Sequence, residues 1–299
     1  MRSKALFKRP QLGRGYAMIL MLFGSLVISF SGLLIRNISS ADTWQINFYR
    51  SLAFGCTISV LLILRYGKSA PKKVKLIGSS GFFAAALLAL AGITFLQAIT
   101  NTTVAATTFT LCTIPFLTAI MARLFLGERV AKSTMLTLVA ATFGISLMFV
   151  QGLGAGSYYG NMMALLCALA FSGYATVVRS NRGSDMLPAL VLSNIIIIFI
   201  GLIVSKGNLL ILWEDLLLCL ILGGILSATV NTLFVIASKY LLAAELTLFM
   251  LLEFTFGPIW VWIFINESPN TWTLIGGIIV IFSVLLKSIM ELLHLHFHR

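Results

Sequence analysis

The chain has 299 residues, of which 59% are apolar and 10% are charged, and it carries a formal net charge of +12. Soluble globular proteins carry about 25% charged residues, so this composition excludes an ordinary water-soluble domain. It is also the opposite of the weakly hydrophobic, strongly charged composition of disordered chains. We therefore predict an all-α membrane protein.

Ten segments are long and apolar enough to be predicted as membrane-spanning helices. A span needs roughly 20 mostly apolar residues, because the hydrocarbon core is about 30 Å thick and a helix rises about 1.5 Å per residue. In chain order, the predicted spans cover residues 15–35, 44–64, 76–99, 103–126, 132–151, 158–178, 186–205, 214–238, 242–265 and 271–290. The connections between them are too short to hold a soluble domain.

The positive charge is concentrated on one side of these spans. Of the 21 Lys and Arg residues, 18 lie near span ends on one side, Arg50 lies within a span, and only Arg36 and Lys206 lie on the other side. Because loops rich in Lys and Arg stay in the cytoplasm, both termini are predicted to be cytoplasmic. The charge is thus a signal of topology in a multi-pass protein of the cytoplasmic (inner or plasma) membrane, and no nucleic-acid partner is expected.

An internal repeat is predicted from two segments, residues 105–130 and 244–269, which align at a shift of 139. The shift places Ile114 opposite Glu253 and Glu128 opposite Glu267. Five spans separate the copies, and an odd number inverts one copy in the bilayer. We therefore expect a cytoplasmic tail at 1–14, a five-helix repeat at 15–151, an inverted five-helix repeat at 158–290 and a second cytoplasmic tail at 291–299. Inverted repeats are typical of secondary transporters, which hold substrate near the midplane.

The chain resembles the EamA-type ten-helix permeases of the drug/metabolite transporter superfamily. The matching residues are Phe48, Tyr49 and Arg50 in the second span; Thr103, Val104, Ala105 and Ala106 at the start of the fourth; Pro115 within it; Leu126, Gly127, Glu128, Arg129 and Val130 at its end; and Leu252, Glu253, Asn266 and Glu267 in the second copy. The resemblance implies export or uptake of small metabolites, such as amino acids, without ATP. We predict a secondary transporter of small polar metabolites that exports them by alternating access.

Glu253 is the sharpest candidate site residue because it lies about 11 residues into the ninth predicted span. That places it about 16 Å deep, near the bilayer midplane. A lone ionised carboxylate is costly there. We expect it either to bind a substrate amine or to couple transport to protons; the alternative is a protonated or hydrogen-bonded acid that locks two helices together.

Other polar side chains inside spans complete the candidate site. Arg50 and Asn47, at i and i−3, share a helix face and either bind an anion or clamp two helices. Gln97 and Asn101 form a polar stripe on the third span, and Asn231 lies well inside the eighth. The candidate substrate-binding or coupling residues are Glu253, Gln97, Asn101, Asn231, Arg50, Asn47, Thr110 and Tyr174.

Three further residues are predicted to break helices or to gate. Pro115 and Pro258 each remove a backbone N–H within a span, which exposes a carbonyl to a cavity or only kinks the helix. Glu245 is expected to be a gate or the partner of Lys239 or Arg123.

Nothing in the sequence predicts an enzyme, a metal site or a cofactor. The chain has no phosphate-binding glycine loop with its lysine, and its four Cys residues fall inside spans without paired spacing. The expected partners are a small-molecule substrate and the bilayer, with protons and a homodimer as further options. Two other functions remain open: import of a nucleotide-like or vitamin-like metabolite, and a structural or lipid-handling role without a solute pathway.

Overall fold

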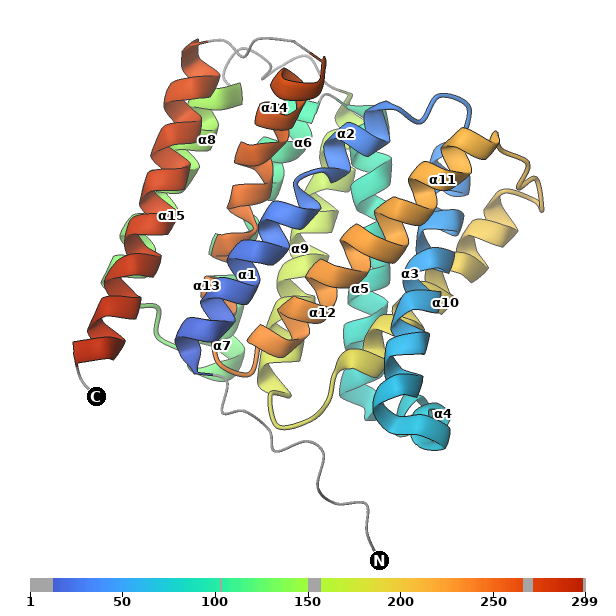
Figure 1. Cartoon of the computed structure of the whole chain (residues 1–299), viewed down its shortest axis with the longest axis horizontal. Coiled ribbons are helices and arrows are strands. Elements are labelled where there is room, and N and C mark those ends of the chain that lie inside the picture. Colours follow the sequence, from blue (N-terminus) through green and yellow to red (C-terminus); the bar gives the residue numbers. More distant parts are fainter. Residues whose placement is uncertain (1–12, 103, 150–156, 266–270, 298–299) are drawn as a thin grey trace, which may run out of the picture.

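The computed structural model describes residues 13–102, 104–149, 157–265 and 271–297, and it contains helices and no strand within these ranges. The helices are α1 (Arg14–Ile28), α2 (Ser31–Arg36), α3 (Thr43–Tyr66), η1 (Gly67–Ser69), α4 (Ala70–Lys75), α5 (Gly78–Asn101), α6 (Val104–Leu111), α7 (Ile114–Leu126), α8 (Lys132–Phe149), α9 (Tyr158–Ser180), α10 (Leu187–Val204), α11 (Trp213–Ile221), η3 (Leu222–Ser227), α12 (Ala228–Ala237), α13 (Ala243–Phe249), α14 (Leu251–Ile265) and α15 (Thr271–Phe297). They pack side by side as one bundle, and α1 begins at the same end of it at which α15 finishes (Figure 1).

The predicted all-α membrane class is confirmed. Among the described residues, seven helical segments are long and apolar enough to cross a membrane: 14–36, 43–75, 78–101, 107–126, 158–180, 187–204 and 213–237. Their outward faces carry many exposed large apolar side chains, as expected where lipid replaces water. The spans predicted at 132–151, 242–265 and 271–290 coincide with α8, with α13 and α14, and with α15. The count of ten spans stays a prediction.

Four of the predicted spans are interrupted rather than continuous. The breaks lie between α1 and α2, between α6 and α7, at η3 between α11 and α12, and between α13 and α14. Pro115 lies in the first turn of α7, where its missing N–H costs no hydrogen bond. The segment η3 is a single turn of π-helix, a form that often occurs at functional sites. The breaks matter because each one brings backbone or a polar side chain to the middle of the bundle.

Glycines allow two of the closest helix approaches. A Cβ at Gly223 of η3 would lie 1.9 Å from the carbonyl oxygen of Arg50 on α3, and a Cβ at Gly144 of α8 would lie 2.7 Å from the carbonyl oxygen of Gly276 on α15. Small residues at helix contacts are typical of membrane bundles, in which backbones must approach closely to gain packing energy.

Hydrogen bonds tie the connecting segments to neighbouring helices. Asp215 at the start of α11 accepts bonds from the backbone N–H groups of Ser39, Ser40 and Ala41 at 2.8–3.1 Å, and its side chain also pairs with the Ser40 hydroxyl. On α3, Tyr49 donates to the carbonyl of Leu209 at 2.6 Å. These bonds fix the entry of α3 and therefore the position of Arg50, which follows Tyr49 directly.

Candidate functional site

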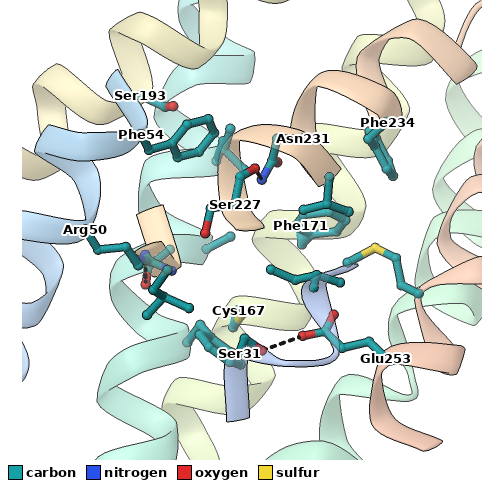
Figure 2. A pocket seen from close by; sticks show the side chains of 18 of the residues that line it. Ser31, Arg50, Phe54, Cys167, Phe171, Ser193, Ser227, Asn231, Phe234 and Glu253 are labelled. Carbon is teal, nitrogen blue, oxygen red and sulfur yellow. Dashed lines mark hydrogen bonds between the residues drawn. The ribbon is translucent and has the colours of Figure 1, made fainter. Parts of the chain in front are cut away.

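A cavity of about 150 Å³ lies inside the bundle, where several of the helix breaks meet. Most of its wall is apolar, and Figure 2 shows many of the side chains that line it. The polar residues that line it are Ser31, Arg50, Cys167, Ser193, Asn194, Ser227, Asn231 and Glu253. A mostly apolar pocket with a few placed polar groups is the usual form of a small-molecule site.

Glu253 enters the cavity from the start of α14, because the α13–α14 break falls at Met250. The facing break, between α1 and α2, brings Ser31 to within hydrogen-bond distance, and the Ser31 hydroxyl donates to Glu253 Oε1 at 3.2 Å (Figure 2). Nearby, the Ser25 hydroxyl donates to the carbonyl of Phe249 at 2.7 Å, which satisfies one carbonyl at the end of α13. No cation pairs with Glu253 among the described residues. The acid is thus left available to a ligand.

Arg50 enters the same cavity from α3, on the side opposite Glu253 in Figure 2. Its Nη2 atom donates two long hydrogen bonds, each 3.4 Å, to Asn47 Oδ1 and to the carbonyl of Gly92 on α5. In the described part of the chain, no carboxylate forms an ion pair with it. A guanidinium forms strong bidentate bonds with carboxylates, so Arg50, half-buried at the cavity wall and held only by neutral oxygens, is suited to receive an anion.

Asn231 and Ser227, both on the eighth predicted span, line the same cavity as the two charged groups. The Asn231 amide donates to the carbonyl of Ser227 at 2.9 Å, which leaves its side-chain oxygen turned to other partners. Asn194 on α10 also lines the cavity, and its Oδ1 has no hydrogen-bond partner among the described residues. The site therefore offers neutral amide oxygens beside the two charged groups.

Aromatic side chains form the apolar wall. Phe171 and Phe234 line the cavity with their rings 5.6 Å apart at 72°. Tyr174 stacks on Phe234 at 5.7 Å and 23°, and it is fully buried without lining the cavity. Edge-to-face and offset-stacked pairs are the favourable geometries for such rings, so this wall is a rigid apolar surface.

Of the eight predicted substrate-binding or coupling residues, the structure brings Glu253, Arg50 and Asn231 together at the cavity. Asn47 lies behind Arg50 and is fully buried. The remaining candidates do not line the cavity: Tyr174 lies behind Phe234, Thr110 lies on α6, and Gln97 and Asn101 lie near the end of α5.

The two residues of the predicted polar stripe on the third span, Gln97 and Asn101, form hydrogen bonds with each other. The Asn101 amide donates to the backbone carbonyl of Gln97 at 2.8 Å and to its side-chain oxygen at 3.3 Å. Asn101 is exposed and Gln97 is buried. In this structure the two side chains contact each other near the end of α5, outside the cavity lining, and their role in binding a ligand stays a prediction.

The three predicted gating residues have different surroundings. Pro115 lines no part of the cavity but directly follows the α6–α7 break. Pro258 falls within α14, and its side chain lies outside the described residues. Glu245 pairs with Arg14 and Lys287 in place of the expected Lys239 or Arg123, because the start of α13 is buried beside α1 and within reach of the Lys287 side chain rather than at the surface.

Sequence reasoning missed several lining residues. Ser31 lines the cavity because α1 ends at Ile28 and α2 begins at Ser31. No proline or pair of glycines in the sequence indicates this break. Phe54 and Phe171 are apolar residues inside predicted spans, and the sequence does not indicate that they face a cavity. The structure places both in the cavity wall. Asn194 is recognisable in the sequence as a polar residue inside an apolar span, and its neighbour Ser193 also lines the cavity.

The polar groups on the cavity wall are of kinds that bind small charged molecules. Within the described residues, no group of three His, Cys, Asp or Glu residues could hold a metal ion. The groups on the wall are one cation, one acid, hydroxyls, amides and aromatic rings. Such a set can hold a small charged molecule by both of its poles.

Comparison with known proteins agrees with this fold. Residues 15–150 match the model of the EamA-like transporter family. Among the solved structures that match is a crystal structure with a TM-score of 0.73 and 13% sequence identity, covering 91% of this chain and 98% of the other, which shows a shared fold. A search of curated proteins gave no match. The first part of the chain, residues 15–150, is therefore similar to the EamA-like transporter family, which belongs to the drug/metabolite transporter superfamily.

Proposed function

We propose that the chain is a secondary transporter that exports small polar metabolites, amino acids above all, by alternating access in the cytoplasmic membrane. The cavity binds one molecule at a time between two five-helix repeats, 15–151 and 158–290, of opposite orientation. Both termini are cytoplasmic, as the 18 Lys and Arg residues near span ends on that side favour.

The observation that carries this proposal is the pair of opposite charges at the cavity. Arg50 has no acidic partner and Glu253 has no basic partner among the described residues, yet both line one cavity. A buried charge without a partner is costly, so a ligand that supplies both missing charges is favoured. An amino acid does so, with its carboxylate at Arg50 and its ammonium at Glu253.

The aromatic wall narrows this class further. Phe54, Phe171 and Phe234 line the same cavity as the two charged groups. Transfer of apolar surface from water to such a wall is favourable by about 25 cal/mol per Å². We therefore favour a zwitterion with an apolar or aromatic side chain over a small, wholly polar one.

The positions of the helix breaks support the inverted repeat. The α6–α7 break follows Leu111, and the α13–α14 break falls at Met250, which is the position 139 residues later. Broken helices at equivalent places of two halves are common where transporters bind substrate.

A second candidate, import of a nucleotide-like or vitamin-like metabolite, is favoured by the same phenylalanines, since aromatic rings stack on flat heterocycles. Such a ligand need not carry an ammonium group. Glu253 would then serve proton coupling alone.

The test compares three ligands that share one ring. Phenylalanine carries both charges, phenethylamine carries only the ammonium, and 3-phenylpropionate carries only the carboxylate. Because a ligand that binds the folded state raises its stability by mass action, thermal unfolding of the purified protein is measured with each. We expect phenylalanine to raise the melting temperature most.

The variants Arg50→Gln and Glu253→Gln should remove the advantage of phenylalanine over the single-charge ligands, whereas Arg182→Gln, at an exposed turn, should keep it. Equal shifts by all three ligands would contradict the zwitterion. A larger shift by a flat heterocycle than by phenylalanine would favour the second candidate.

A further inference from the structure

Two buried acids hold the start of α13, and the proposed function leaves both without a role. The first is Glu128, which follows the left-handed Gly127 that ends α7. Its Oε1 accepts a hydrogen bond from Arg179 Nε at 2.6 Å, and its Oε2 accepts one from the backbone N–H of Ala243 at 3.2 Å. Arg179 also donates to the carbonyl of Ser238 at 2.9 Å. One carboxylate thus ties α7 to α9 and to the first residue of α13.

The second acid is Glu245, which lies in the first turn of α13. Its Oε2 accepts a hydrogen bond from the backbone N–H of Leu242 at 3.1 Å. Its Oε1 accepts one from Arg14 of α1 at 2.5 Å, and Lys287 of α15 lies 3.5 Å from the same atom. The Glu245 side chain is only 3% exposed. Together the two acids fix the first turn of α13 to four other helices.

The place of α13 gives these contacts a consequence for the cavity. The helix packs against α7, α9 and α1, and its residues from 243 to 249 are all buried. It ends at the break where Met250 and then Glu253 line the cavity. In Figure 1, α13 continues from α14 toward the end of the bundle at which α1 begins. It therefore lies between the cavity and that end, which is called the α13 end below.

We propose that Glu128 and Arg179 are gate residues, which hold α13 across the cavity and keep it closed at the α13 end. When Glu128 releases Arg179 and the N–H of Ala243, α13 moves about the Met250 break and the cavity opens on that side. The proposal rests on the proposed function, since a gate has a role only where a solute passes.

The low exposure of the Glu128–Arg179 ion pair is consistent with a role in gating. The side chains of Arg179 and Glu128 are 7% and 14% exposed. Removing one partner of a buried pair leaves an uncompensated charge, which is strongly unfavourable unless water reaches it. The gate therefore has a closed state, with the pair formed, and an open state, with both charges hydrated.

Cys167 provides a natural reporter because its thiol lines the cavity. The other three cysteines, Cys56, Cys112 and Cys219, are free and can be replaced by serine. A membrane-impermeant maleimide is then applied from each side of oriented vesicles. A separate Gly183→Cys variant marks the α13 end, because a Cβ at this exposed turn meets no atom within 4 Å.

We expect Glu128→Gln to raise the labelling rate of Cys167 from the α13 end by about tenfold, which corresponds to the loss of one hydrogen bond to a charged group. The matched control is Asp185→Asn. It removes a carboxylate that pairs with Tyr66 and Arg65 at the same end of the bundle without contact to α13, and it should leave the rate unchanged.

A double variant that exchanges the two charges of the pair distinguishes loss of the gate from a general folding defect. Glu128→Arg combined with Arg179→Glu should label more nearly like the parent protein than like Glu128→Gln, whereas a purely structural defect would persist. Labelling of Cys167 that responds to neither change at residue 128 overturns the gate but leaves the cavity in place. A Cys167 that is unreactive from both sides in every variant contradicts the proposed function itself.

Discussion

Replacement of Gly223 by alanine should separate two helices at the point where Arg50 enters the cavity. A Cβ at this glycine of η3 would lie 1.9 Å from the carbonyl oxygen and 2.9 Å from the Cα of Arg50. Ordinary contacts begin near 3.4 Å, so η3 and α3 must move apart by about 1.5 Å. Both atoms belong to backbone, and no side-chain rotation can relieve the overlap.

The cost follows from overpacking, which typically destabilises a core by about 1–3 kcal/mol. A rigid overlap of this size should fall near the upper end, about 3 kcal/mol. A change of 1 kcal/mol moves the melting temperature of a domain of 150–250 residues by roughly 2–4 °C. We therefore expect Gly223→Ala to unfold about 6–12 °C below the unaltered protein in detergent.

The adjacent Gly224 is the matched control. A Cβ there meets the Thr57 hydroxyl at 3.3 Å and the Ala53 Cβ at 3.5 Å, and the Thr57 side chain can yield. Since alanine is also favoured over glycine inside a helix by about 0.5–1 kcal/mol, Gly224→Ala should stay within about 2 °C of the unaltered protein. Equal melting temperatures for the two variants would refute the close packing of η3 on α3.

Three further outcomes are expected. Gly144→Ala should lower the melting temperature by several degrees, because its Cβ would lie 2.7 Å from the Gly276 carbonyl oxygen; a protein as stable as the parent would contradict the α8–α15 contact. Asp215→Asn should cost about 1–3 kcal/mol of stability, since an amide group cannot accept all the bonds that the carboxylate receives; urea titration in mild detergent measures this. Arg50→Lys should bind phenylalanine less tightly than the parent, because an ammonium lacks the bidentate fork; isothermal titration should show the weaker binding, and equal affinity would argue against a carboxylate contact.

Much of the helical organisation could be predicted from hydropathy alone. A backbone in lipid must satisfy its own hydrogen bonds, so each long apolar segment becomes helix, and each of the ten predicted segments coincides with helix in the structure. The breaks within them were harder to predict. Pro115 indicated the break between α6 and α7. The break before Ser31 depends instead on contacts with α14, such as the hydrogen bond from Ser31 to Glu253.

The cavity could be predicted only in part, because the rotation of each helix decides which polar groups face inward. Glu253 and Arg50 stood out as charges deep in apolar spans, and both line the cavity. Gln97 also lay in a span, yet it bonds with Asn101 near the end of α5.

Long-range partners lay beyond sequence reasoning altogether. Glu245 pairs with Arg14, which is 231 positions away, and the buried partner of Glu128 is Arg179 on another helix. No local pattern indicates such pairs, because they form only when the helices assemble.

The most direct test of the account is counterflow of radiolabelled phenylalanine in proteoliposomes that contain the parent protein, Arg50→Gln or Glu253→Gln. We predict saturable counterflow by the parent protein and a loss of at least about tenfold in each variant, since each removes one hydrogen bond to a charged ligand group. Saturable counterflow that is unchanged in both variants would show that the two charges of this cavity do not hold the substrate.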